Sequence, residues 1–273
     1  METLYSGEKS ELTPGFEYQA PVLAALKDAR QAGITAGYTD IATGLGKTHM
    51  IACDIKDFLE EEPDARVLYL CHIGPILDQA SKTFTKVLGT KSHGQMYGGE
   101  IQDQQVTFAT FQTMGNKLDE GRVYEAFDPK EFDYIVVDEG HHGPAPTYQS
   151  VINYFEPKFL RGMTGTAERR DAQDISEIFG DPISTIKLEE AIAKGYLTPP
   201  DYHVLTDHIQ QLETVNGKTT KAELEKMNGM VFVPKRDTEI VKTVDKHLED
   251  IEDPRTVVFC SSVAQAEYFS GLF

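Results

Sequence analysis

The sequence is poor in cysteine and has no long apolar run, and each shortage excludes a class of protein. Its three cysteines, Cys53, Cys71 and Cys260, lie far apart without a C-x-x-C pair. Neither a disulfide framework nor a zinc ribbon is therefore expected, and we interpret these residues as buried free thiols in a reducing compartment. No run of 18 apolar residues occurs, and the N-terminal residues lack the basic region and apolar core of a signal peptide. We therefore expect a cytoplasmic protein that does not enter a membrane.

Basic residues are also scarce. The chain has 26 lysines and arginines against 44 aspartates and glutamates, which gives a formal net charge of -18. This balance argues against a general electrostatic attraction to nucleic acid or to anionic membranes. Binding of nucleic acid would need local contacts, for example a basic patch from Lys158, Arg161, Arg169 and Arg170, although a solvated surface is the default interpretation of these four residues.

The most informative stretch is the glycine-rich turn IATGLGKT at 41–48, which lies between an expected strand and an expected helix. Gly44 and Gly46 allow the backbone to turn so that its N–H groups and the helix N-terminus can face the oxygens of a phosphate. In such a loop, Lys47 reaches the terminal phosphates and the Thr48 hydroxyl binds Mg²⁺. The pattern predicts nucleotide contacts from Thr43, Gly44, Leu45, Gly46, Lys47 and Thr48.

Apolar segments of strand length alternate with helical patterns around this turn. We expect strands over 34–41, 66–71, 105–110, 132–138 and 158–164, and helices over 16–32, 48–58, 76–87 and 148–155. Such alternation indicates an α/β fold with a doubly wound parallel sheet. Ligands bind at the carboxyl ends of the strands in these sheets. The loop at 41–48, Asp138–Glu139 and Thr164–Thr166 all stand at such ends and should meet in one crevice.

The acidic pair Asp138–Glu139 indicates what kind of nucleotide-binding protein this is. Asp138 ends an apolar strand and can hold Mg²⁺ through water, and Glu139 can orient and deprotonate an attacking water. Alone, such a pair is more often ordinary polarity at a strand end, but its position after the phosphate loop makes chance a poor explanation. The segment 116–119 matches the guanine-reading N-K-x-D motif, but it precedes the acidic strand and we interpret it as a chance match.

Taken in order, these motifs resemble those of superfamily 2 helicases of the DEAD/DEAH-box type, in the branch related to bacterial type III restriction subunits. Residues 42–48 are similar to the A-T-G-x-G-K-T loop of that family, which dispenses with a first glycine, so Ile41 fits. Asp138–His142 resembles the D-E-x-H box and Thr164–Arg169 the T-A-T-P-E-R motif, with Gly165 in place of the usual alanine. Tyr18–Gln19 resembles the Y-Q that faces adenine.

The resemblance implies a RecA-like P-loop NTPase that binds ATP and Mg²⁺ and moves on nucleic acid, with DNA favoured over RNA. Lys47 and Glu139 would then be catalytic, and Thr48 and Asp138 would hold the metal. It further assigns adenine recognition to Gln19, coupling of hydrolysis to movement to His142, Thr164 and Thr166, and contact with the nucleic-acid backbone to His72 and Thr110.

The regular alternation of strand and helix patterns stops near Thr198–Pro200. We expect helices over 235–248 and 263–273 and a strand over 256–260, which resembles the first strand motif of a second motor domain. The expected organisation is an N-terminal lead at 1–15, a first RecA-like domain at 16–200, a connecting segment at 201–254 and the truncated start of a second RecA-like domain at 255–273.

An arginine finger, which contributes roughly 10³ to 10⁵ in rate, belongs to the second domain in this family. The chain alone is therefore expected to bind ATP and to hydrolyse it weakly or not at all. The alternative is an ATP-binding switch or interaction module that moves nothing. The sequence leaves open the polarity of movement, unwinding against translocation, the oligomeric state, and any protein partner or associated nuclease.

Overall fold

A computed structural model of the chain describes residues 17–89, 93–100, 102–139, 146–165, 175–200, 234–252, 256–260 and 262–272. The chain divides into two compact units, Met1–Asp201 and Tyr202–Phe273. None of the helices in these described ranges is long and apolar enough to cross a bilayer.

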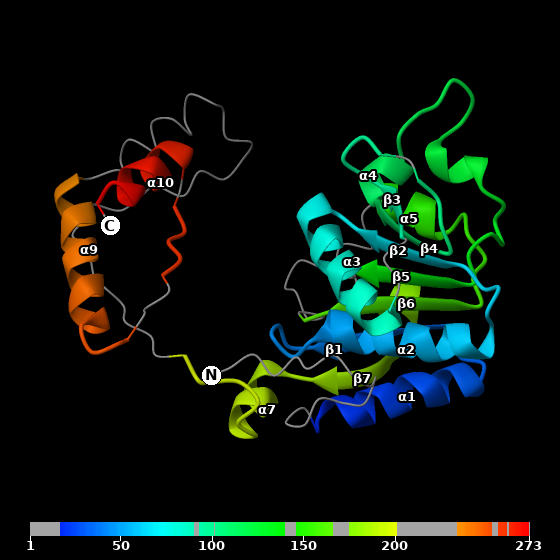
Figure 1. Ribbon diagram of the computed structural model, residues 1–273, viewed down its shortest axis with the longest axis horizontal. Coiled ribbons are helices and arrows are strands. Elements are labelled where there is room, and N and C mark those ends of the chain that lie inside the picture. Colours follow the sequence, from blue (N-terminus) through cyan, green and yellow to red (C-terminus); the bar gives the residue numbers. More distant parts are fainter. Residues whose placement is uncertain are drawn as a thin grey trace. The chain divides into compact units, whose positions relative to one another are not determined.

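The first unit is built on a sheet of seven strands in the order β3-β4-β2-β5-β6-β1-β7 (Figure 1). Every neighbouring pair in this sheet is parallel. The strands are β1 (Ala36–Ile41), β2 (Val67–Cys71), β3 (Gly94–Met96), β4 (Val106–Thr110), β5 (Tyr134–Asp138), β6 (Phe159–Thr164) and β7 (Pro182–Ile186). An all-parallel sheet confirms the predicted doubly wound α/β class.

Helices cover both faces of the sheet (Figure 1). One buried cluster joins the sheet to α1, α2 and α3, and a second joins the opposite face to α4, α5, α6 and a short 3₁₀ helix. The helices are α1 (Gln19–Gln31), α2 (Lys47–Glu61), α3 (Gly74–Leu88), α4 (Phe111–Met114), η1 (Val123–Ala126), α5 (Pro146–Ile152), α6 (Ser176–Phe179) and α7 (Leu188–Ala193).

The central strand β2 shows why its sequence forms this sheet. All five of its residues are buried. Because side chains alternate across a strand, Val67 and Tyr69 join the core under α1 to α3, while Leu68 and Leu70 join the opposite core. A run of apolar residues without polar alternation is what burial on both faces requires.

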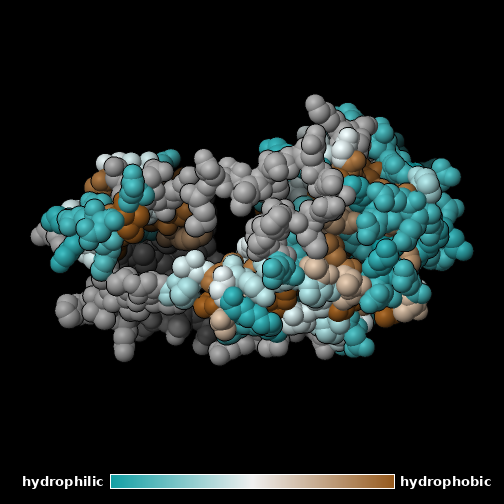
Figure 2. All heavy atoms as spheres, turned by 60° about the horizontal axis from the view of Figure 1, so that its bottom comes forward, coloured by the Kyte–Doolittle hydropathy of each residue, from teal (hydrophilic) through white to brown (hydrophobic). Residues whose placement is uncertain are grey.

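The outer surface agrees with the acidic, charged composition. In the view of Figure 2, hydrophilic side chains cover most of the coloured surface of the first unit, and hydrophobic ones show only in small groups. The described part of the chain thus displays no broad apolar face in that view.

The strands and helices expected within the first unit are present, with ends that differ by a few residues. Two strands were not predicted, β3 and β7. β3 has only three residues, and β7 has one buried position in five. Neither shows the apolar periodicity that identifies a strand in sequence.

In the second unit, α9 (Pro234–Leu248) and α10 (Val263–Ser270) confirm the two helices expected there. The strand expected over 256–260 is wrong, because these residues form no strand with any described segment, and Val257 and Phe259 are 77% and 95% exposed. An extended segment becomes a strand only when a neighbour pairs with its N–H and C=O groups. Residues 201–233 of the expected connecting segment 201–254 lie outside the described residues, so the domain assignment of this unit stays a prediction.

Candidate functional site

The phosphate loop lies between β1 and α2 as the sequence predicted. Gly44 and Gly46 have φ angles of +94° and +80°, in the left-handed region that other residues rarely adopt. Gly46 is the N-cap of α2, so the helix begins at Lys47. Thr43, Gly44 and Gly46 are exposed. The loop therefore presents the N-terminus of a 15-residue helix to solvent, which is the geometry of an anion site.

The ammonium group of Lys47 lies inside this turn. Its Nζ donates to the Ile41 carbonyl oxygen at 3.1 Å. Burial lowers the pKa of Lys47, while the nearby carboxylates of Glu139, Asp138 and Asp40 oppose this shift. A partly desolvated cation facing carboxylates gains much from an anionic ligand.

Asp138 is the last residue of β5 and is only 6% exposed. Its Oδ2 accepts a hydrogen bond from the Tyr69 hydroxyl at 2.6 Å, and its Oδ1 accepts one from the Glu139 N–H at 2.9 Å. Burial raises the pKa of Asp138, and the bond from Tyr69 opposes that rise. Glu139 has a φ of +53°, so the backbone turns sharply after the strand.

The end of β6 completes the group of three segments. Thr164 is fully buried, and the next residue, Gly165, lies against the phosphate loop. A Cβ atom at Gly165 would lie 3.1 Å from the Ile41 carbonyl oxygen, 3.1 Å from Thr43 Oγ1 and 3.2 Å from Lys47 Nζ. The structure therefore brings together the three strand ends that the sequence singled out. His142 and Thr166 lie outside the described residues.

Gln19 lies beside the loop. Its Nε2 donates to the Leu45 carbonyl oxygen at 3.3 Å, and the Tyr18 hydroxyl donates to the same oxygen at 3.3 Å. Both side chains are buried, at 4% and 7% exposure. The glutamine is thus attached to the phosphate loop, and its assignment to adenine recognition stays a prediction.

His72 directly follows β2, and Thr110 is the last residue of β4. These strands are parallel neighbours, so the two residues lie at the same edge of the sheet. The Thr110 hydroxyl caps α4 by accepting the Thr113 N–H at 3.1 Å. The same hydroxyl donates to the Thr113 hydroxyl at 2.9 Å. Contact by either residue stays a prediction.

The proposed basic patch is wrong for Arg161. This residue is 1% exposed, and its guanidinium donates to the carbonyl oxygens of Ile34 at 2.8 Å and Leu160 at 3.2 Å. No pattern in the sequence indicated that a charged residue of β6 would point into the core. Lys158 forms ion pairs with Glu62 and Asp133, and Arg169 and Arg170 lie outside the described residues.

Sequence reasoning missed two features of this site. One is Tyr69, which donates a hydrogen bond to Asp138. Its hydroxyl is the only side-chain oxygen of the apolar strand β2, and this oxygen was the feature of the sequence that could have identified it. The other is the segment after α7. The centroid of the Tyr196 ring lies 4.7 Å from that of the Tyr18 ring. Leu197 Cδ2 would lie 3.3 Å from a Cβ atom added at Gly44, so this segment also approaches the phosphate loop. No motif marked that segment.

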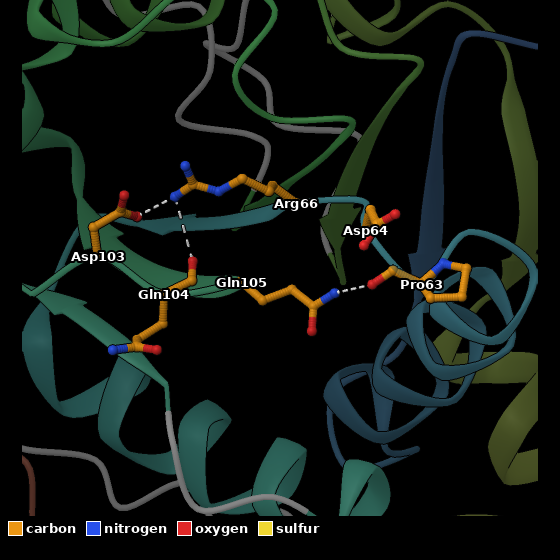
Figure 3. Close-up of a pocket in the computed structure, with 6 residues that line it drawn as sticks. All are labelled: Pro63, Asp64, Arg66, Asp103, Gln104 and Gln105. Atoms are coloured by element: carbon orange, nitrogen blue, oxygen red, sulfur yellow. Dashed lines mark hydrogen bonds and ion pairs between the residues drawn. The ribbon is translucent and has the colours of Figure 1, made fainter.

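A polar hollow elsewhere on the first unit is a weaker candidate for a ligand site. It is lined by Pro63, Asp64, Arg66 and residues 103–105, where β2 and β4 begin (Figure 3). In Figure 3 the Arg66 guanidinium points to Asp103, with which it forms an ion pair, and it forms another with Glu131. The hollow lies at the amino ends of the strands, away from the loop, and its cation already has carboxylate partners.

The described residues contain no group of three His, Cys, Asp or Glu side chains placed to hold a metal ion. The Thr48 hydroxyl and the Asp138 carboxylate are nevertheless hard oxygen donors of the kind that Mg²⁺ uses together with water and substrate phosphates. This donor set fits a metal that arrives with a nucleotide.

Comparison with known proteins gives a family match. Residues 13–169, more than half of the chain, match the family described as Type III restriction enzyme, res subunit (ResIII). The chain is 24% identical over 247 residues to the endonuclease subunit of the type I restriction enzyme EcoAI from Escherichia coli, covering 83% of this chain and 30% of that protein.

Two further similarities agree with this match. A protein of Halobacterium salinarum assigned as the DNA 3'-5' helicase Rad25 is 30% identical over 182 residues, covering 64% of this chain and 28% of that protein. A fragment structure of a protein assigned as the HsdR subunit of a type I restriction enzyme from Vibrio vulnificus has a TM-score of 0.59 at 21% identity, covering 93% of this chain and 44% of that one, and supports the fold. The chain spans less than a third of either sequence relative.

Proposed function

Because the chain belongs to the type III restriction enzyme res-subunit family of superfamily 2 helicases, we propose that it is the ATP-binding part of a DNA helicase or translocase motor. The observation that carries the proposal is the meeting of the phosphate loop with Asp138 and with Gly165 at adjacent strand ends. A nucleotide site needs its phosphate cradle and its carboxylates within reach of one ligand, and this arrangement provides both.

Each residue then has a defined task. The loop N–H groups and Lys47 bind the phosphates, and Gln19 reads the adenine. Thr48 and Asp138 hold Mg²⁺, which neutralises charge on the phosphates when bound. Glu139 orients and deprotonates the attacking water. Thr164, Thr166 and His142 couple hydrolysis to movement.

We take DNA as the polymer, because one relative carries the name of a restriction endonuclease subunit and another that of a DNA helicase. His72 and Thr110 contact its backbone in this proposal. A cytoplasmic location is part of the same proposal and rests on the cysteine pattern. The rival function, an ATP-binding switch that moves nothing, is not favoured, since the relatives include proteins assigned as helicases and a restriction endonuclease subunit.

The test is ATP turnover with and without single- and double-stranded DNA, on this chain and on the longest natural form of the protein. We expect DNA to raise turnover at least about tenfold in the longer form. Glu139→Gln is the matched control: it should retain ATP binding and lose turnover by roughly 10² to 10⁴. A longer form with Glu139 intact and no DNA-stimulated hydrolysis would contradict the motor function.

A further inference from the structure

Tyr69 lies in the middle of β2 and is completely buried. Its ring forms a cluster of three with Phe84 and Phe108, whose centroids lie 5.5 and 5.3 Å from that of Tyr69 and 5.2 Å from each other. This aromatic packing restrains the direction of the side chain. The hydroxyl therefore has a defined position near the carboxyl edge of the sheet.

That hydroxyl reaches the proposed nucleotide site at Asp138. It donates to Asp138 Oδ2 at 2.6 Å. A phenol has a single proton, and Asp138 receives it.

This bond has a chemical consequence for the carboxylate. Asp138 is held at both oxygens, by Tyr69 and by the Glu139 N–H. The carboxylate therefore has a fixed plane before any ligand binds.

We propose that the Tyr69 hydroxyl is a positioning group that holds the Asp138 carboxylate in the orientation that binds Mg²⁺ with the nucleotide. The inference rests on the proposed function, because it assumes that this carboxylate faces the metal. Outer hydrogen bonds of this kind orient metal ligands and set the affinity of a site.

The simpler interpretation is a buried tyrosine that merely has a hydrogen-bond partner. The same sheet supplies a control for it. Tyr134, on the neighbouring strand β5, is also fully buried and donates to a buried carboxylate, Asp54, at 2.6 Å. Asp54 lies in α2, seven residues after Lys47, and is not in the phosphate loop.

The experiment compares Tyr69→Phe with Tyr134→Phe, each of which removes one oxygen atom. Binding of a fluorescent ADP analogue is measured in EDTA and across a Mg²⁺ titration, and Mn²⁺ binding to the ADP complex is followed by electron paramagnetic resonance. For Tyr69→Phe we expect an unchanged affinity in EDTA and a Mg²⁺ midpoint raised about tenfold, the effect of one lost hydrogen bond to a charged group. Tyr134→Phe should change neither value.

Two outcomes would overturn the positioning role: a Mg²⁺ midpoint within twofold of the wild type, or an equal loss of affinity in EDTA. A Tyr69→Phe chain that fails to fold would also overturn it, because the hydroxyl would then serve the fold itself. If the wild type binds no ADP at any Mg²⁺ concentration, the proposed function fails, and this result is distinct from a failure of the positioning role alone.

Discussion

The first unit uses the same side-chain pair at both ends of its sheet. Tyr69 donates to Asp138 at the carboxyl end, and Tyr134 donates to Asp54 at the amino end, each at 2.6 Å. All four side chains are buried. The pairs differ in what surrounds the carboxylate, and that difference separates a structural network from a ligand site.

At the amino end the carboxylate is enclosed by cations. Arg30 Nε lies 3.0 Å from Asp54 Oδ1, with side-chain exposures of 3% and 1%, and Arg161 adds a second buried positive charge. Burial raises the pKa of Asp54, while the bonds from Tyr134 and Arg30 oppose the rise. This end has charges of both signs within the core and stabilises the fold.

At the carboxyl end the cation and the carboxylate each hydrogen bond with other groups. Lys47 donates to the Ile41 carbonyl, and Asp138 receives the Glu139 N–H and the Tyr69 hydroxyl. Left-handed φ angles at Gly44, Gly46 and Glu139 bend the chain around this space. Of these three, only Glu139 is strained, because glycine adopts such angles freely. Backbone strain of this kind is typical of functional sites, and a ligand can complete the charge balance there.

The largest expected effect distinguishes the two carboxylates. Asp54→Asn leaves the buried guanidinium of Arg30 without its charged partner in the core and should lower the free energy of unfolding by about 3–5 kcal/mol. Urea unfolding measures this loss. Asp138→Asn is the matched control and should cost much less stability while weakening the Mg²⁺ dependence of nucleotide binding. Equal destabilisation by both substitutions would contradict the assignment of a structural role to the amino end and a ligand-binding role to the carboxyl end.

The next effect concerns the close approach of Gly165 to the loop. Gly165→Ala would place a Cβ 3.2 Å from Lys47 Nζ and 3.1 Å from Thr43 Oγ1. The loop must shift, and we expect a loss of about 1–2 kcal/mol in stability together with several-fold weaker ATP binding.

Gly89→Ala serves as the control for that substitution. Gly89 has a φ of +70° and no atom within 4 Å of an added Cβ, so the substitution should cost about 1 kcal/mol through backbone strain. ATP binding, measured by calorimetry, should not change. Unaltered ATP affinity in Gly165→Ala would show that the β6 end does not constrain the phosphate loop.

A smaller effect is expected from Tyr134→Phe. Removing the hydroxyl takes one hydrogen bond from the buried Asp54 carboxylate and should lower the free energy of unfolding by about 1–2 kcal/mol. Urea unfolding of Tyr134→Phe and Tyr69→Phe side by side gives the comparison. Both should lose stability, and only Tyr69→Phe should change the response to Mg²⁺.

The smallest effect is one of pH. Burial lowers the pKa of His49, in the first turn of α2, below its ordinary value of 6.5. The unfolded chain therefore binds the proton first as pH falls below 6.5, and the stability that neutral His49 provides is lost. Asp54 has a raised pKa in the folded state, so acidification favours the folded state at that residue.

We expect the free energy of unfolding to fall by less than about 1 kcal/mol between pH 7.5 and 5.5 through His49. His49→Gln should flatten this part of the curve in urea titrations at each pH. A variant that follows the wild-type slope would assign the pH dependence to other groups.

Much of the fold could be predicted from sequence because its strands are buried on both faces. The five predicted strands and the main helices carried clear apolar patterns, and the phosphate loop carried its own glycines. β7 and β3 did not, since one has a single buried position and the other only three residues. The segment 256–260 looked like a strand, but pattern alone does not provide the pairing partner that a strand needs.

The site was predictable where a motif lies in one stretch of sequence and missed where contacts cross the sheet. Lys47, Asp138 and Gly165 could be placed together because strand ends meet at one edge. Arg161 and Tyr69 could not, because the direction of a long side chain depends on packing. No pattern in the sequence indicated that the Thr110 hydroxyl would cap α4.

The most direct test of the central claim is equilibrium binding of a non-hydrolysable ATP analogue, in Mg²⁺, to the wild type and to Lys47→Ala. Circular dichroism and urea unfolding should first show that the fold of the variant is intact. We expect the wild type to bind the analogue and Lys47→Ala to lose at least about 100-fold in affinity, the effect of charge-assisted bonds to phosphate. Equal affinity in both proteins would contradict the assignment of the carboxyl end of the sheet as a nucleotide site.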